Sequence, residues 1–232
     1  MNAPIIAIDG PAGTGKSSTA QGVASALQWA YVDSGSFYRA AALLALRYDV
    51  DLEDAPGRAT LRDRLGNARI DQRMVGGRLR TWLNGTDITD AIRSAAVTRT
   101  VSRVAEDPSV RSIVNQDLRR RVGDNPAVVD GRDIGTVVFP DAFLKIYLVA
   151  SLEERARRRA SELEPEEQKL DAPLLASYAQ GLAERDRQDQ ERTEAPLAAA
   201  DDAVRLDTTN LDLEAQIGRV VRMARDRMNQ SS

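Results

Sequence analysis

Where the first apolar run of the chain ends, the sequence reads Gly10-Pro11-Ala12-Gly13-Thr14-Gly15-Lys16-Ser17-Ser18. The part from Gly10 to Ser17 fits the pattern G-x-x-x-x-G-K-[ST]. The run Pro4–Asp9 predicts a buried strand before this loop, and Lys16–Leu27 predicts a helix after it. A glycine-rich turn in that position lets backbone amides and a helix N-terminus surround a phosphate. The sequence therefore predicts a nucleoside triphosphate site, and the alternative is a chance glycine-rich turn or a loop that no longer binds.

The side chains of this loop have separate expected roles. The Lys16 ammonium is expected to reach the β- and γ-phosphates, and the Ser17 hydroxyl to bind Mg²⁺ together with ATP phosphates and water. All residues from Gly10 to Ser18 are expected to bind ATP. A guanine-specific N-K-x-D pattern is absent, because Asn84-Gly85-Thr86-Asp87 lacks the lysine. This absence disfavours a GTPase.

Strands are predicted to alternate with helices along most of the chain. A helix is predicted over Ser36–Tyr48, with a hydroxyl side chain as its cap. The other buried-strand candidates are Ala30–Asp33, Ala127–Asp130, Leu144–Val149 and Ala203–Leu206. Such alternation predicts an α/β fold in which a parallel sheet is flanked by helices.

Two segments depart from this alternation. Between about Ala68 and Ile92, strand-like runs surround Gly76-Gly77 and Asn84-Gly85, which predicts a small antiparallel β insertion within residues 62–93. The charged segment Ser151–Lys169 predicts a helix followed by a mobile stretch near Pro165, and residues 152–170 are expected to form a helical lid. The insertion is too short for a core of its own, so residues 1–232 are predicted to form a single domain.

Composition excludes much enzyme chemistry. With neither Cys nor His, the chain has no disulfide, thiolate nucleophile, Ser-His-Asp triad or Cys/His zinc site. The 32 Lys and Arg residues against 35 Asp and Glu residues disfavour nonspecific nucleic-acid binding. No basic leader segment precedes the first apolar run, and no run of about 18 apolar residues occurs. These features predict a cytoplasmic protein that binds neither membrane nor nucleic acid.

Several later segments closely resemble the bacterial cytidylate kinase family. They are Tyr31–Arg39, Val129–Pro140, Glu153–Arg159, Glu184–Asp189 and Arg192–Leu197. The block Gly131–Pro140, which reads GRDIGTVVFP, is more specific than the phosphate-binding loop. Departures from the family pattern are Ser36 and Phe37, where small and aliphatic residues are usual, and the lid sequence after Ser161. The resemblance covers nearly the whole chain.

The resemblance implies a P-loop kinase that transfers the γ-phosphoryl group of ATP to CMP or dCMP, with Mg²⁺ as cofactor. The oligomeric state does not follow from the sequence, and a monomer is the default expectation. It implies that Lys16, Arg155 and Arg159 are catalytic and that Arg158 binds ATP. The positions that match the family's acceptor-binding residues are Ser102, Arg111 and Asp133 for the base, Arg39, Arg132 and Arg192 with Ser34 and Tyr38 for the phosphate, and Arg185 and Asp189 for the sugar.

Chemistry is compatible with these roles, but each has a plainer alternative. Cytosine presents an amino donor beside two acceptors, so its pocket needs an acceptor such as Asp133 and a donor such as Arg111. In the alternative interpretation, Asp133 forms an ordinary ion pair and Tyr38 packs in the core. The arginine-rich helices would then be solvent-exposed faces held by salt bridges. Two rival functions also stay open: another small-metabolite kinase, such as a shikimate-type enzyme, and an ATP-binding regulatory module that has lost phosphoryl transfer.

Overall fold

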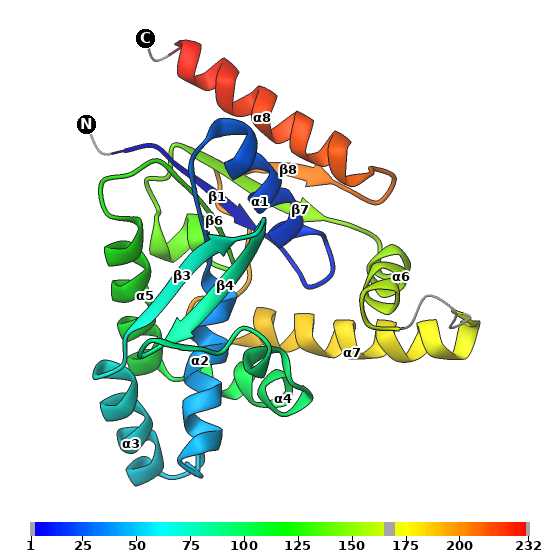
Figure 1. Cartoon of the computed structure of the whole chain (residues 1–232). Helices are drawn as coiled ribbons and strands as arrows, with labels where there is room; N and C mark the ends of the chain where they lie inside the picture. Colours follow the sequence, from blue (N-terminus) through cyan, green and yellow to red (C-terminus); the bar gives the residue numbers. More distant parts are fainter. Residues whose placement is uncertain (1–2, 165–169, 231–232) are drawn as a thin grey trace. The chain divides into compact units, whose positions relative to one another are not determined.

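The computed structural model describes residues 3–164 and 170–230 (Figure 1). Two compact units divide the chain. Unit 1 combines the residues up to Tyr31 with those from Asp124 onward, and unit 2 is Val32–Gly123. The stretch near Pro165 that was predicted to be mobile, and with it part of the predicted lid, lies outside the described residues.

Unit 1 is built on a parallel sheet. Within the described residues this sheet has five strands in the order β2-β6-β1-β7-β8. Their bounds are Ile5–Asp9 for β1, Ala30–Asp33 for β2, Ala127–Asp130 for β6, Leu144–Val149 for β7 and Val204–Asp207 for β8. The central strand β1 pairs in parallel with both β6 and β7. Ile6, Ala7 and Ile8 of this strand are fully buried, which is why the strand reads as a continuous apolar run.

Helices cover this sheet and extend beyond it (Figure 1). Helix α1 (Lys16–Leu27) packs on β6 and on α8 (Leu213–Gln230), which also contacts β7. Helix α6 (Leu152–Leu163) packs against α7 (Ala172–Glu191). The predicted α/β class with a helix-flanked parallel sheet is confirmed. No helix in the described ranges is long and apolar enough to cross a membrane.

Unit 2 combines helices with a small antiparallel sheet. Helix α2 (Ser34–Arg47) packs against the other three helices, which are α3 (Ala55–Gly66), α4 (Ala95–Val104) and α5 (Pro108–Val122). A short 3-10 turn, η1 (Ala91–Arg93), precedes α4. The sheet consists of β3 (Ile70–Val75), β4 (Arg78–Leu83) and β5 (Thr86–Asp87) in that order. This sheet confirms the predicted antiparallel strands.

The two tight turns of this sheet have the backbone that their sequences predict. Gly76 and Gly77 have φ angles of 57° and 77° between β3 and β4, and Asn84 and Gly85 have φ angles of 51° and 80° between β4 and β5. Two consecutive residues with positive φ characterise the hairpin turns that glycine and asparagine favour.

The predicted start and cap of α2 were wrong. The helix begins at Ser34, and its cap is the carboxylate of Asp33, which accepts a hydrogen bond from the Ser36 backbone amide at 3.3 Å. The Ser36 hydroxyl donates to the same carboxylate at 2.6 Å. The Asp33 carboxylate therefore caps this helix, where a hydroxyl side chain was predicted. Strand β8 is likewise shifted by one residue from its prediction.

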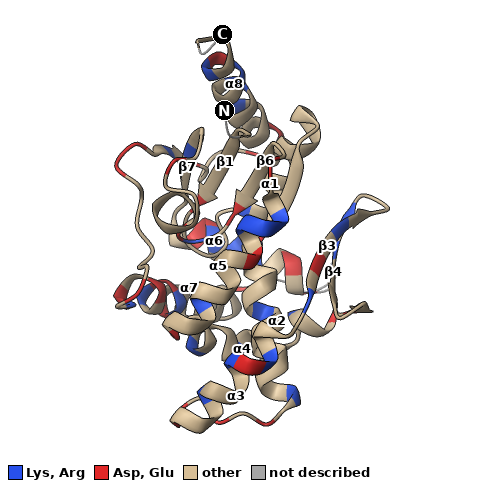
Figure 2. Ribbon diagram, turned by 90° about the vertical axis from the view of Figure 1, so that its left-hand side faces the viewer, with Lys and Arg blue, Asp and Glu red and all other residues tan. Residues whose placement is uncertain are grey.

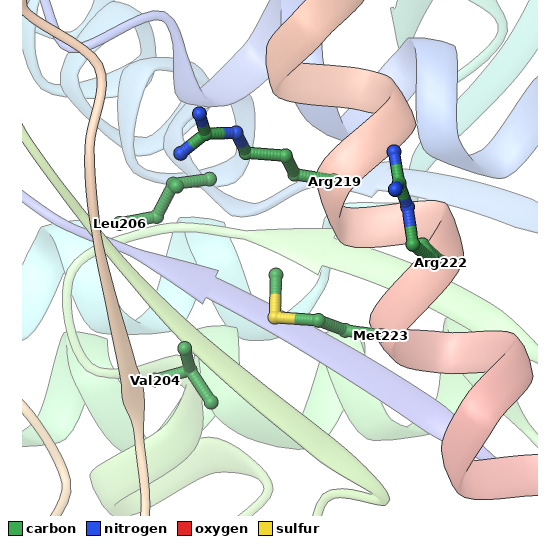
Figure 3. A pocket seen from close by; sticks show the side chains of 5 residues that line it. All are labelled: Val204, Leu206, Arg219, Arg222 and Met223. Atoms are coloured by element: carbon green, nitrogen blue, oxygen red, sulfur yellow. The ribbon is translucent and has the colours of Figure 1, made fainter.

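An open pocket of about 480 Å³ lies between β8 and α8 (Figure 3). It is lined by Val204, Leu206, Arg219, Arg222 and Met223. None of these residues belongs to the predicted site, so this pocket does not include the phosphate-binding loop.

Candidate active site

Glycines give the phosphate-binding loop its path out of β1. At Gly10, where φ is 145°, a Cβ atom would lie only 2.2 Å from the Leu148 carbonyl oxygen. Gly15 has a φ of 86° and immediately precedes α1. Any side chain would clash at the first position and strain the backbone at the second. The loop conformation therefore depends on both glycines.

The N-terminus of α1 has no side-chain cap, unlike the other α-helices of the described residues. Gly15 occupies its cap position and offers no side-chain acceptor. The capping residues elsewhere are Asp33, Asp54, Ser94, Asp107, Ser151, Asp171 and Asp212. Amides at a helix N-terminus carry partial positive charge and bind anions. The uncapped end of α1 therefore suits a phosphate group.

Lys16 lies buried inside the loop, with 6% of its surface exposed. Its Nζ donates hydrogen bonds to the Pro11 carbonyl at 2.6 Å and to Thr14 Oγ1 at 3.5 Å. Burial first, and then the charge of Arg132, holds the pKa of Lys16 well below its ordinary value, and Arg185 acts in the same direction. Three cationic groups thus share one region of unit 1. An anion bound among them would favour all three charges.

Ser17 faces an acid at the end of β6. Its Oγ donates to Asp130 Oδ2 at 2.8 Å, and the Tyr31 hydroxyl donates to Asp130 Oδ1 at 3.0 Å. A hydroxyl beside a carboxylate is an oxygen set that fits Mg²⁺, which usually takes few protein ligands besides phosphate and water. The structure therefore places Asp130 beside the predicted metal residue.

Arg155 and Asp186 hold the loop at Ala12 from two sides. The Ala12 amide donates to Asp186 Oδ1 at 3.2 Å, and Arg155 Nη1 donates to the Ala12 carbonyl at 3.1 Å. The arginine also donates to the second carboxylate oxygen of Asp186. Beneath these bonds, Ala12 packs on Ala156 and Leu182. Both charged residues are under 9% exposed, so α6 and α7 are joined to the loop by a buried ion pair.

The other two predicted lid arginines differ from each other. Arg158 Nη1 donates to the Thr14 carbonyl at 3.3 Å and to Thr208 Oγ1 at 3.1 Å, so it also touches the loop. Arg159 pairs with Glu162 at 3.0 Å, a residue of its own helix. Basic and acidic residues are mixed along α6 and α7 (Figure 2). Of the three arginines, the structure therefore brings Arg155 and Arg158 to the loop.

Unit 1 also holds five of the predicted acceptor residues. Arg132 Nε donates to Asp189 Oδ2 at 2.8 Å, and Arg192 Nη1 lies 3.8 Å from Asp189 Oδ1. Burial opposes both shifts, yet this pairing raises the pKa of Arg132 and lowers that of Asp189. The charge of Arg185 also lowers the pKa of Asp189. Asp133, the fifth of these residues, is buried, with 4% of its surface exposed. Helix α7 ends at Glu191, so Arg192 lies just beyond the helix that carries Arg185 and Asp189.

Unit 2 holds the remaining predicted acceptor residues. The Arg111 guanidinium lies 5.4 Å from the centre of the Tyr38 ring, and its Nη1 donates to the Ala105 carbonyl at 3.1 Å. Arg39 Nη1 donates to Thr98 Oγ1 at 3.0 Å. Ser34 is buried at the start of α2, and Ser102 is half-buried on α4. Tyr38 and Arg111 therefore form one cluster, in which the tyrosine is also a core residue.

Sequence reasoning missed Asp9, the last residue of β1. Its Oδ1 accepts from the Ile134 amide at 2.9 Å and its Oδ2 from the Gly135 amide at 2.7 Å. Burial raises the pKa of this carboxyl to about 6, against the lowering effect of those two amides and of Lys16. An acid at the end of an apolar strand, directly before a phosphate-binding loop, is the sequence signal that could have marked it.

The raised pKa of Asp9 predicts a pH-dependent stability. The folded state binds the proton more tightly than the unfolded state, so this group's contribution is complete below about pH 4 and is lost as the pH rises through about 6. Two pKa units correspond to about 3 kcal/mol. Urea unfolding of the wild type and of Asp9→Asn from pH 4 to 7 measures the loss as a changing stability gap between the two proteins. A constant gap would mean that Asp9 titrates as it does in the unfolded chain.

Sequence comparison decides the family. The cytidylate kinase family model matches residues 6–226. The chain belongs to this family. Among relatives, the cytidylate kinase of Desulfitobacterium hafniense (strain Y51) is 43% identical over 226 residues, which cover 96% of this chain and 93% of that protein. The resemblance of the sequence to cytidylate kinases and the P-loop kinase fold class are therefore confirmed.

Other relatives are longer than this chain. A bifunctional pantoate ligase/cytidylate kinase of Synechococcus sp. (strain JA-3-3Ab) is 42% identical over 228 residues, which cover 98% of this chain and 42% of that protein. The chain thus spans less than half the length of such bifunctional cytidylate kinases. A solved structure of an uncharacterized protein from Eubacterium ventriosum ATCC 27560 covers 96% of this chain and 98% of its own at 10% identity, with a TM-score of 0.50. It shares the fold alone.

Proposed function

We propose that the chain transfers the γ-phosphoryl group of ATP to CMP or dCMP and releases ADP with CDP or dCDP. The observation that carries this proposal is that Lys16, buried at the uncapped start of α1, interacts with the charges of Arg132 and Arg185, which both lower its pKa. Lys16 belongs to the ATP loop, and the two arginines match acceptor positions of the family. A donor phosphate and an acceptor phosphate are both anions that this cluster would stabilise.

The proposed roles of the acceptor residues follow the family positions that these residues match. Arg132 and Arg192 would hold the CMP phosphate with Arg39, while Asp133 and Arg111 would read the base with Ser102. Ser34 and Tyr38 would support the phosphate, and Arg185 with Asp189 would bind the sugar. Within one kinase domain, residues 62–93 would form the nucleotide-binding insertion and 152–170 the lid.

The chemistry requires little from the protein beyond position and charge. The CMP phosphate has a second pKa of about 6, so its oxygen is largely ionised near neutral pH and attacks without a general base. Lys16 and the arginines neutralise the charge that develops on the transferred group. Ser17 and Asp130 would hold Mg²⁺, which when bound neutralises charge on the β- and γ-phosphates of ATP. The monomeric state and the cytoplasmic location remain predictions.

A panel of acceptors separates this function from its rivals. The protein is incubated with ATP, Mg²⁺ and a set of nucleoside monophosphates together with shikimate. Formation of CDP or dCDP supports the proposal and removes the regulatory-module alternative. Phosphorylation of an unrelated metabolite alone would replace the proposed acceptor.

Asp133→Asn tests base recognition directly. An ionised Asp133 accepts from the cytosine amino group but offers no donor to the O4 atom of uracil, whereas asparagine offers both an acceptor and a donor. A buried polar mismatch costs about 1–3 kcal/mol, which is roughly tenfold to a hundredfold in selectivity. We expect the variant to lose kcat/KM for CMP while its preference for CMP over UMP shrinks.

Both substrates are assayed on one folded preparation, because a general defect would lower both values equally. An unchanged ratio of the two kcat/KM values would remove Asp133 from base recognition and leave it as a structural residue.

A further inference from the structure

The loop between β6 and the short π-helical turn η2 (Ile134–Val138) carries Arg132 and Asp133. The end of β1 holds this loop on both sides of those two residues. The Gly131 amide donates to the Ile8 carbonyl at 3.0 Å, and the Ile134 and Gly135 amides donate to the two carboxylate oxygens of Asp9. The β1 strand therefore fixes the segment between Gly131 and Gly135.

Asp133 occupies the position from which a carboxylate ordinarily caps its own helix. Aspartate is a preferred residue there, because its side chain accepts from amides two or three positions later. Asp133 does not do so: it stands at the cap of η2 without a side-chain hydrogen bond to that turn. Its carbonyl accepts from the Val137 and Val138 amides, at 2.9 Å and 3.1 Å. Asp9 caps the first two amides of η2 in its place.

The Asp9 side chain is buried and closely packed, so it has little room to change its conformation. Asp9 is 5% exposed. A Cβ on Gly135 would lie 3.2 Å from Lys145 Cδ and 3.3 Å from Asp9 Oδ2, so both side chains pack directly on the glycine. The carboxylate thus contacts the turn at van der Waals distance as well as through hydrogen bonds.

We propose that Asp9 is a positioning residue for acceptor recognition: by capping η2 from β1, it keeps the Asp133 carboxylate from folding back onto its own turn. This inference rests on the proposed function, in which Asp133 reads the base and Arg132 binds the acceptor phosphate. Asp9 itself touches neither nucleotide in this scheme. It acts through the orientation of the two residues that do.

Asp9→Asn tests the proposal. Asparagine has one carbonyl acceptor, so one of the two η2 amides loses its partner and becomes a target for Asp133. We expect the KM for CMP to rise about tenfold or more and the preference for CMP over UMP to shrink, because a lost buried hydrogen bond has an effect of about that size. The KM for ATP should change less than about twofold. Asp226→Asn is the matched control, since Asp226 is exposed on α8 and is expected to leave the CMP/UMP ratio unchanged.

A second variant and a direct measurement keep the proposal testable if Asp9→Asn does not fold. Gly135→Ala adds a methyl group that crowds the Asp9 carboxylate from the η2 turn. This variant should therefore show the same CMP-selective defect. Amide hydrogen exchange at Ile134 or Gly135, measured without nucleotide, should differ between Asp9→Asn and the wild type. In the double variant with Asp133→Asn, the Asp9 substitution should change the CMP/UMP ratio no further. Equal losses for ATP and CMP, or additive changes in that ratio, would overturn the positioning role.

Failure of the inference is distinguishable from failure of the proposed function. If Asp133→Asn alters the CMP/UMP ratio while a folded Asp9→Asn does not, the positioning role is wrong and the acceptor site stands. If the wild type forms no CDP or dCDP, or Asp133→Asn leaves the ratio unchanged, the acceptor assignment itself is wrong.

Discussion

Lys16→Ala is expected to lower kcat by at least ~100-fold without a loss of folding stability. Removal of one preorganised charged donor at a reacting phosphate has an effect of this order. The stability expectation has a separate cause. Burial and neighbouring arginines already disfavour the Lys16 charge, as its lowered pKa shows, so its removal relieves repulsion in the nucleotide-free protein. Its two hydrogen bonds are made within the loop itself.

Steady-state rates at saturating ATP and CMP measure kcat, and urea unfolding measures stability, both on one preparation. Lys16→Met is the matched control for packing, because it keeps an unbranched side chain of similar length while removing the charge. Both variants should lose turnover to a similar extent. A folded Lys16→Ala protein with near-normal turnover would contradict the role assigned to the loop lysine.

The parts of the fold that the sequence predicts well are those with local signals. Both ends of helix α1 were predicted correctly, and the glycine-rich turn before Lys16 marks its start. The strands β6 and β7 were also predicted to the residue, since each is a short apolar run that is buried on both faces. The start of α2 was missed because Asp33, Ser34 and Ser36 are all possible caps, and only the backbone geometry selects among them.

The missed parts of the site depend on tertiary contacts. Asp186 lies 174 residues from its partner Ala12, and Asp9 lies 125 residues from Ile134. No periodicity in the sequence connects such pairs. Arg155 and Arg159 illustrate the same limit within one helix, because the sequence treats them alike. The structure buries one against the loop and pairs the other with Glu162.

Arg155→Ala is expected to damage both stability and turnover, and Arg159→Ala turnover alone. Removal of Arg155 leaves Asp186 buried without its charge partner, and the loss of one member of such a pair costs about 3–5 kcal/mol. Arg159 forms a partly exposed pair within α6, which contributes little to stability. With both arginines assigned to the lid over ATP, kcat should fall more than CMP affinity in each variant.

The double variant Arg155→Ala/Asp186→Ala separates the two effects of Arg155. It removes the buried carboxylate together with the arginine, so part of the lost unfolding free energy should return while turnover stays low. Denaturant unfolding, kcat and CMP affinity are measured for the two single variants and the double variant. Recovery of turnover along with stability would show that Arg155 acts only by neutralising the buried Asp186 carboxylate. Loss of CMP affinity as the main effect in both single variants would instead assign the arginines to the acceptor site.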